Sequence, residues 1–126
     1  MGQLWESDFE KAQEKAAQEN KKLLLIFSGS DWCIPCIRFD REVWHNKDFM
    51  AYAKEKLVLY RADFPKRKKN QLSPALATKN KALAEVYNPK GYFPWVVVFG
   101  AEGKFKGTFV YTKSPVEEYI QKISAL

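Results

Sequence analysis

The chain contains two cysteines, Cys33 and Cys36, and two residues separate them. They follow an apolar run, Leu23 to Phe27, and a short polar loop, an order typical of a strand that leads into a helix. Residues i and i+3 lie on the same face of a helix, so the two sulfurs can meet there. Pro35 favours a helix start at this point, because proline is tolerated in the first helical turn. The spacing therefore predicts a redox-active dithiol at a helix N-terminus.

The helix start favours a thiolate on Cys33, because unpaired N–H groups and the positive end of the helix dipole lie there. We expect Cys33 to be the exposed attacking thiolate and Cys36, one turn inward, to be the resolving thiol. Either Ser30 or Asp31 is expected to cap the helix. Trp32 is expected to shield Cys33 and to offer an apolar surface to a substrate.

Other roles for the cysteine pair stay open from the residues alone. A structural disulfide across so small a ring would remove little loop entropy from the unfolded chain. A zinc site needs four ligands, and His45 is the one histidine of the chain. We expect His45 to be a surface or capping residue. A buried, inert pair is the third alternative. Redox chemistry is the interpretation that explains the spacing, so we predict no metal ligands.

The run FSGSDWCIPCIRFDREVW, residues 27–44, resembles the thioredoxin superfamily. It is most similar to the exported bacterial thioredoxin-like thiol-disulfide oxidoreductases and disulfide isomerases, and to the thioredoxin-like domain of membrane thiol-disulfide interchange proteins. The similarity extends from about Trp5 to the C-terminus. It implies one thioredoxin-like domain over residues 1–126, with an α/β fold in which helices flank both faces of a mixed central sheet. It also implies that the Cys33–Cys36 disulfide serves without a bound cofactor.

The resemblance assigns a role to Pro94, because the family proline at this position is cis and lies against the disulfide. Phe93 would then offer its backbone N–H and C=O to an extended substrate segment beside Cys33. With Trp32, Ile34 and Pro35, these two residues form the expected substrate-binding set. The alternative is a turn that only starts a strand.

One departure from the family concerns the strand before the cysteines. Ordinary thioredoxins carry a buried aspartate there that assists proton transfer at the resolving cysteine. This chain has Leu25, Ile26 and Phe27 in that region and no carboxylate. Water, a backbone group or Asp31 would have to take that role, or deprotonation of Cys36 is slow.

The rest of the chain reads as alternating helices and strands, followed by a hairpin with its turn at residues 101–104. Leu4 and Trp5 are expected to pair with a sheet edge or to pack on the core. Ser7, Ser73 and Ser114 are the expected helix caps. The expected helices cover residues 8–20, 34–44, 47–56, 74–87 and 115–125, and the expected strands cover residues 23–27, 57–63, 95–99 and 106–111.

The chain has a net charge of +6, and part of the excess lies in the run Lys66 to Lys69. Nucleic-acid binding is the specific interpretation of such a run, but no base-stacking motif or recognition helix accompanies it. We therefore expect a solvated loop and no nucleic-acid partner, with docking of acidic partners as the alternative.

No apolar run approaches the roughly 20 residues of a membrane helix, and no signal peptide is present. Met1 and Gly2 are followed at once by polar, foldable sequence. We expect a periplasmic or otherwise exported protein whose leader is absent from this chain, with a cytoplasmic location as the alternative. A monomer is expected.

The predicted function is dithiol–disulfide exchange on protein thiols and disulfides, in the reductive direction, with an unidentified electron-donor protein. The reductive direction is favoured because Ile34 and Pro35 place no positive group between the cysteines. Protein disulfide isomerase is the alternative within the enzyme class. A peptide-binding or chaperone module without turnover, which would use the groove near Trp32, Phe93 and Trp95, and a copper- or zinc-handling protein are the alternatives from other classes.

Overall fold

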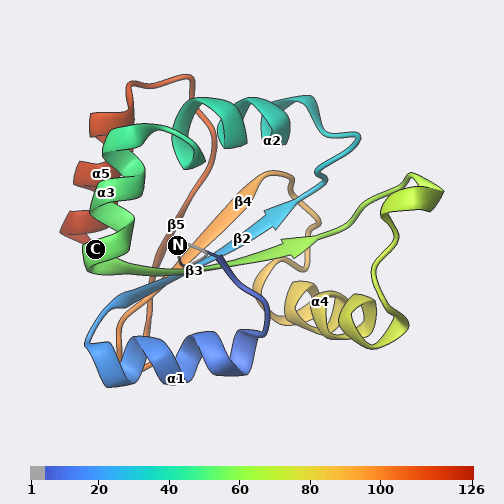
Figure 1. Cartoon of the computed structure of the whole chain (residues 1–126), viewed down its shortest axis with the longest axis horizontal. Helices are drawn as coiled ribbons and strands as arrows, with labels where there is room; N and C mark the ends of the chain where they lie inside the picture. The colour runs from blue at the N-terminus through green and yellow to red at the C-terminus, as the bar shows by residue number, and fades with distance from the viewer. Residues whose placement is uncertain (1–4) are drawn as a thin grey trace.

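A computed structural model describes residues 5–126, which form a mixed sheet with the strand order β1-β3-β2-β4-β5 (Figure 1). Strands β1, β3 and β2 run parallel, whereas β4 is antiparallel to both β2 and β5. The strands are β1 (Trp5–Glu6), β2 (Lys22–Ser28), β3 (Leu57–Asp63), β4 (Trp95–Phe99) and β5 (Phe105–Phe109).

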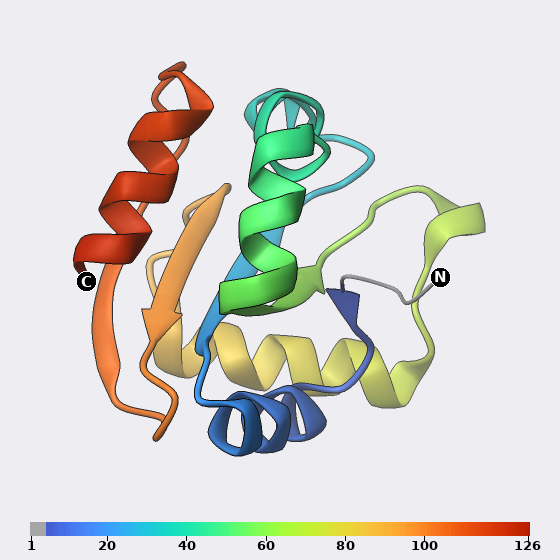
Figure 2. The same cartoon turned by 60° about the vertical axis from the view of Figure 1, so that its left-hand side comes forward.

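Helices cover both faces of this sheet, as the two views in Figures 1 and 2 show. One face carries α2 (Ile34–Phe39), α3 (Lys47–Lys56) and α5 (Val116–Ala125). The other face carries α1 (Phe9–Glu19) and α4 (Pro74–Tyr87). The predicted α/β thioredoxin fold is therefore confirmed. None of the helices among residues 5–126 has both the length and the apolarity that a bilayer crossing requires.

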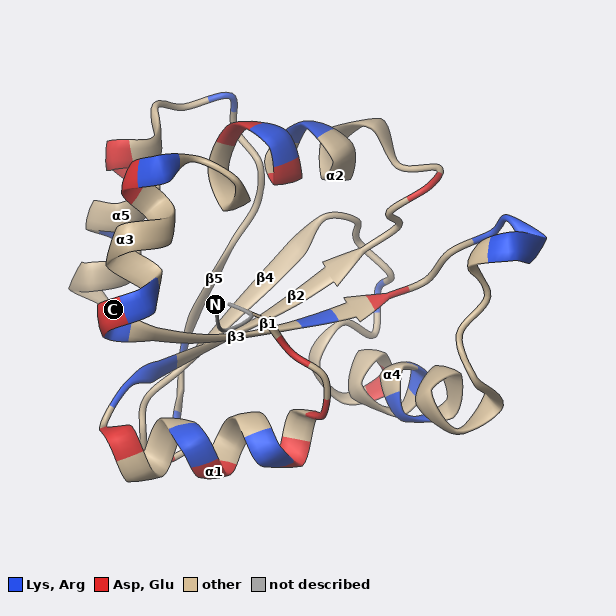
Figure 3. Ribbon diagram, in the orientation of Figure 1, with Lys and Arg blue, Asp and Glu red and all other residues tan. Residues whose placement is uncertain are grey.

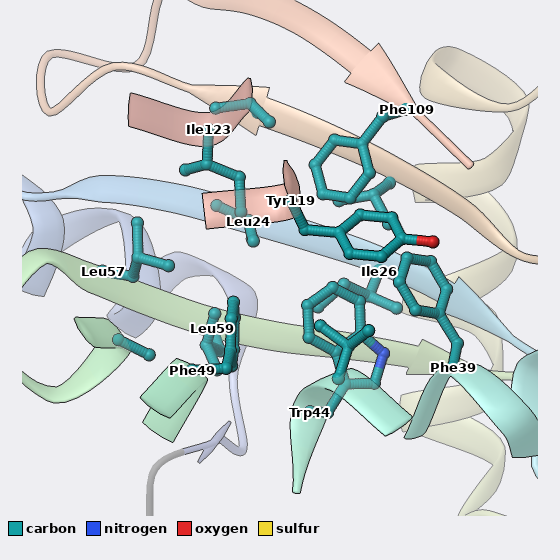
Figure 4. Close-up of a cluster of buried hydrophobic side chains, with 14 residues drawn as sticks. Leu24, Ile26, Phe39, Trp44, Phe49, Leu57, Leu59, Phe109, Tyr119 and Ile123 are labelled. Atoms are coloured by element: carbon teal, nitrogen blue, oxygen red, sulfur yellow. The ribbon is translucent and has the colours of Figure 1, made fainter. Parts of the chain in front are cut away.

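Strand β2 is apolar throughout because its side chains enter two cores. Leu24 and Ile26 point into the cluster beneath α2, α3 and α5. Leu23, Leu25 and Phe27 point into the cluster beneath α1 and α4. All five side chains are almost fully excluded from solvent. Figure 4 shows the first cluster, in which the two β2 side chains meet large aromatic residues from the helices and from β5: Phe39, Trp44, Phe49, Phe109 and Tyr119.

The parallel pairing of β2 with β3 sets the position of the site. Ser28 at the end of β2 is the register partner of Asp63 at the end of β3. The loops that follow β2 and β3 therefore leave the sheet side by side, at the C-terminal ends of these two strands. One loop leads to the cysteines, and the other carries the basic run. Trp5 pairs with Leu59 at the edge of the sheet, as expected, while Leu4 lies outside the described residues.

Two expected helix caps are wrong. Asp8, not Ser7, caps α1, because its carboxylate accepts a hydrogen bond from the N–H of Lys11 at 3.0 Å. The last helix begins one residue later than expected and has no side-chain cap. The hydroxyl of Ser114 instead lies 2.8 Å from that of Thr112. The third expected cap is confirmed, since the Ser73 hydroxyl accepts the N–H of Leu76 at 3.2 Å.

The helix expected over residues 34–44 changes form at its middle. After α2, residues Asp40–Trp44 form a π-helical turn, which we call η1. Such turns insert one residue into the helical repeat. Here the Asp40 carboxylate accepts a 2.6 Å hydrogen bond from Arg61 of β3. His45 follows η1 with an exposed side chain, as expected for a surface residue. The final strand ends at Phe109, two residues earlier than expected.

Candidate active site

The two cysteines form a disulfide at the first turn of α2, with their Cα atoms 5.2 Å apart. Cys33 is itself the N-cap, because its Sγ accepts the N–H of Cys36 at 3.3 Å. The expected caps Ser30 and Asp31 do not fill this position. The carbonyl of Gly29 accepts the N–H of Cys33 at 2.9 Å, so a turn separates both residues from the helix start.

Cys33 is less exposed than expected, with 5% of its surface accessible against 3% for Cys36. The prediction that Cys33 is exposed is therefore wrong, because this residue is buried. The physical reason is that the Cys33 side chain turns back along α2 toward Cys36 instead of away from the protein. The residues that follow Cys33 are open to solvent, since Ile34 is 62% exposed and Pro35 is also exposed. A substrate sulfur can therefore approach along that side.

Backbone N–H groups face both sulfurs. Besides the contact to Cys33, the N–H of Gly29 lies 3.5 Å from the Sγ of Cys36. Hydrogen bonds from N–H groups stabilise a charged acceptor more than a neutral one. The same two donors are therefore placed to stabilise a thiolate on either cysteine when the disulfide opens. A backbone group at Cys36 was one of the alternatives that the missing carboxylate left open.

Asp31 binds the loop that follows β3, not the cysteine helix. Its carboxylate accepts hydrogen bonds from the N–H groups of Lys66 at 2.9 Å and Arg67 at 3.0 Å, and from the side-chain amide of Asn70 at 2.9 Å. These contacts, that with Lys66 first, hold the pKa of the Asp31 carboxyl below its usual value of 3.8. A carboxylate with a lowered pKa is a weaker base, so the geometry favours an anchoring function for Asp31.

Lowering the pH is expected to loosen this anchor. Because the pKa of Asp31 in the folded protein lies below 3.8, its stabilising contribution is present above that pH and is lost as the pH falls through the lowered pKa. The amide resonances of Lys66 and Arg67 should therefore titrate with a midpoint below 3.8. Asp31→Ala should speed the hydrogen exchange of these two amides roughly 10-fold at constant pH. Unchanged exchange rates, matching those of the exposed-site control Glu14→Ala, would contradict the anchor.

Aromatic side chains connect the same loop to the segment before β4. The indole N–H of Trp32 donates to the carbonyl of Phe64 at 2.7 Å. The ring of Phe93 meets the rings of Trp32 and Phe64 edge-on, with centroids 5.5 and 5.4 Å away. The bond between Phe93 and Pro94 is cis. Three segments far apart in the sequence therefore meet beside the disulfide.

An apolar groove of about 440 Å³ opens next to this aromatic cluster. It contains Pro35, Phe93 and Pro94 of the expected substrate-binding set. Trp32 adjoins it through Phe93, and Ile34 lies outside its lining but is exposed. Trp95, which was expected near this groove, also lines it. Three further lining residues were not predicted, because their approach depends on tertiary contacts that no local pattern shows: Tyr92, Val110 and Tyr111.

Gly29 is expected to tolerate no side chain, because a Cβ at this position would collide with the indole of Trp32. Gly29→Ala should therefore displace Trp32 and destabilise the protein by roughly 1–3 kcal/mol. Gly100→Ala is the matched control, since its Cβ would meet the movable ends of the Glu102 and Lys106 side chains. Urea unfolding of both variants tests the prediction, and equal losses of stability would contradict it.

Among residues 5–126, the structure brings together no group of three His, Cys, Asp or Glu side chains that would hold a metal ion. The cysteines are disulfide-bonded to each other.

Comparisons with known proteins agree with this geometry. Residues 4–101 match the family model described as thioredoxin-like. The disulfide bond reductase DsbH of Chlamydia pneumoniae is 31% identical over 121 residues, which cover 96% of this chain and 70% of that protein. A solved structure of a DsbH oxidoreductase is 30% identical, with a TM-score of 0.86 over 96% of this chain and 81% of that one.

The reduced C-terminal domain of DsbD from Neisseria meningitidis is 18% identical, with a TM-score of 0.68 over 93% of this chain and 92% of that chain, and so shares the fold. The family match covers more than half of the chain, and the pairing of two cysteines at a helix start is the chemistry of that family. The chain therefore belongs to the thioredoxin-like family and is a thiol-disulfide oxidoreductase.

Proposed function

We propose that this oxidoreductase is a protein-disulfide reductase in which Cys33 attacks the substrate and Cys36 resolves the intermediate. The observation that carries the proposal is the position of Cys33 as N-cap of α2, with the Cys36 N–H directed at its sulfur. The name of the similar protein DsbH, a disulfide bond reductase, supports the reductive direction. The absence of a cation between the cysteines supports it further, since Ile34 and Pro35 stand there.

The reaction proceeds by two exchanges. The thiolate of Cys33 attacks one sulfur of a substrate disulfide, the substrate S–S bond breaks, and one substrate thiolate leaves. Cys36 then loses its proton and attacks the sulfur of Cys33, which releases the second substrate thiolate. The substrate has gained two electrons, and the enzyme now holds the Cys33–Cys36 disulfide. A donor protein with a dithiol returns the two electrons, so no bound cofactor takes part.

The groove beside the cis proline is proposed to hold the substrate chain. Phe93 precedes the paired residues of β4, and within residues 5–126 its N–H and C=O take part in no turn or loop hydrogen bond. These groups are therefore placed to pair with an extended segment. The apolar surfaces of Trp32, Ile34, Pro35 and Pro94 would contact the side chains of that segment.

Proton transfer at Cys36 is proposed to rely on the Gly29 N–H and on water. The Gly29 N–H stabilises the Cys36 thiolate, which makes loss of the proton less costly. The proton-transfer role of Asp31 stays a prediction, and its three hydrogen bonds to the following loop weigh against it.

An exported, periplasmic location and a monomeric state are proposed as well. The resemblance of residues 27–44 to exported bacterial proteins supports the location, with the cytoplasm as the alternative. The monomeric state stays a prediction from the sequence. Sedimentation of the protein at micromolar concentration would test the oligomeric state.

Catalysed reduction of insulin disulfides tests the proposed function directly. The protein should accelerate insulin reduction by dithiothreitol, and its Cys33–Cys36 couple should equilibrate with glutathione at a reducing potential. A couple near the oxidising end would overturn the reductive direction. Faster recovery of scrambled ribonuclease than reduction of insulin would favour the isomerase, and binding of peptides without turnover would favour a chaperone.

A further inference from the structure

Four consecutive cations form a basic segment, Lys66 to Lys69, which accounts for four of the 21 Lys and Arg residues of the chain. All four side chains are exposed, and none forms an ion pair with a carboxylate of residues 5–126. Figure 3 shows the segment at the tip of the loop that projects beyond β3, next to the loop that leads from β2 to α2. The reductase chemistry proposed above does not use this charge.

The basic segment is held in place at the active-site loop. Asp31 binds two of its backbone N–H groups, and Asp63 binds the N–H of Ser30 at 2.9 Å and its hydroxyl at 2.6 Å. The side-chain amide of Gln71 bridges the carbonyls of Pro65 and Arg67 at 3.0 and 3.2 Å. These anchors hold the backbone of the basic segment beside the active-site loop, which an unattached basic tail would not do.

Lys66 places one of these charges over the ring of Trp32, the residue that precedes the attacking cysteine. Its Nζ lies 4.1 Å from the centre of the Trp32 ring, and Trp32 is the residue before Cys33. The carboxylates at the base of the loop, Asp31 and Asp63, are both engaged by N–H donors. Four cations against two carboxylates leave the local field positive on this side of the disulfide.

We propose that the basic segment binds acidic residues that flank the disulfide of the protein substrate. This inference rests on the proposed reductase function and names the class of substrate. Fixed charges of one sign beside a binding groove raise the encounter rate with oppositely charged partners by 10-fold to 1,000-fold. The apolar groove of Pro35, Phe93 and Pro94 would hold the substrate chain, and the basic segment would select among substrates by charge.

An acidic protein segment fits this surface better than a nucleic acid. Single-stranded nucleic acids bind on exposed aromatic faces that stack with successive bases. The indole of Trp32 is covered by Lys66 on one face and meets Phe93 at its edge, and Phe64 packs against Phe93 and Phe27. The basic segment itself contains no aromatic residue.

Three disulfide peptides test the proposal. They share one sequence around the disulfide and carry two Glu, two Gln or two Lys residues on each side. The native protein should reduce the Glu peptide with a kcat/KM at least about 10-fold above that of the Lys peptide, and this ratio should shrink with added salt. The variant Lys68→Glu/Lys69→Glu leaves the backbone N–H groups bound by Asp31 in place and should reverse the preference.

The matched control makes the same change of net charge at the opposite end of the sheet. The variant Lys54→Glu/Lys56→Glu changes two exposed lysines just before β3 begins and should keep the preference of the native protein. Both variants should reduce the Gln peptide at the native rate and keep the native equilibrium with glutathione. If this control variant lost the preference for the Glu peptide over the Lys peptide, the preference would depend on the net charge of the protein and not on the basic segment, and the proposal would be overturned.

The outcomes separate the two proposals. Reduction of none of the peptides would contradict the reductase function itself. Reduction of all three at equal rates, or an unchanged preference after Lys68→Glu/Lys69→Glu, would leave the reductase intact and overturn the role of the basic segment. Tighter binding of a single-stranded oligonucleotide than of the Glu peptide would also overturn it.

Discussion

Replacing Cys33 by serine is expected to lower the rate of insulin reduction by at least about 1,000-fold, because a serine hydroxyl does not attack a disulfide at neutral pH. The rate is measured by the turbidity of the released insulin B chain. Cys36→Ser should also stop turnover, but for a different reason. It leaves the attacking thiolate intact and removes the thiol that releases the substrate.

The two variants should therefore differ in what they trap. Cys36→Ser should accumulate a mixed disulfide between Cys33 and the substrate, visible as a larger species on a non-reducing gel and located by mass spectrometry. The reason is positional, since Cys33 is the N-cap beside exposed Ile34 and Pro35, whereas Cys36 lies inward against Gly29. The double variant Cys33→Ser/Cys36→Ser controls for non-covalent complexes. Equal trapping through Cys36 in the Cys33→Ser variant would mean that the assigned roles are wrong.

Trp44→Ala is expected to lower the free energy of unfolding by about 3–5 kcal/mol, more than Gly29→Ala or any control variant named above. Trp44 is 2% exposed, and its ring lies 4.5 Å from that of Phe39 and 5.0 Å from that of Phe49, measured between centroids (Figure 4). Its removal would leave a cavity between η1, α2 and α3 that rigid neighbours cannot fill. The free energy of unfolding in urea measures the effect.

Phe105→Ala provides the control for the loss of an aromatic ring. Phe105 is 57% exposed in β5, so its replacement should cost less than about 1 kcal/mol. Comparing the two variants separates the effect of burial on the free energy of unfolding from the effect of removing an aromatic ring as such. Similar losses for the two variants would contradict the assignment of the Trp44→Ala loss to the burial of its ring.

The sequence was sufficient to predict the features that depend on local pattern. The apolar run at Leu23 to Phe27 predicted a strand, and the side chains of β2 enter both cores, which explains why the run is uninterrupted. Ser73 followed by proline predicted the start of α4 correctly. The cis bond before Pro94 came from family resemblance, because proline chemistry in general favours trans.

Features that depend on contacts between distant parts of the chain could not be predicted from the sequence. Aspartate is a favoured residue at helix caps, so the sequence suggested this role for Asp31. In the fold its carboxylate instead accepts hydrogen bonds from the backbone N–H groups of Lys66 and Arg67, thirty-five and thirty-six positions along the chain. Ser7 and Asp8 are adjacent residues of similar capping strength, so local pattern does not decide between them. The burial of Cys33 follows from the orientation of its side chain toward Cys36, which spacing alone does not give.

The position of Trp32 also gives the protein a built-in optical reporter. Trp32 precedes Cys33 in the sequence. Its indole ring lies under the Lys66 ammonium, and its N–H donates a hydrogen bond to the Phe64 carbonyl. Disulfides quench the emission of neighbouring indoles, and a nearby charge or hydrogen bond shifts its wavelength. The contribution of Trp32 to the emission intensity should thus follow the redox state, whereas its wavelength should report whether the contacts with Lys66 and Phe64 are in place.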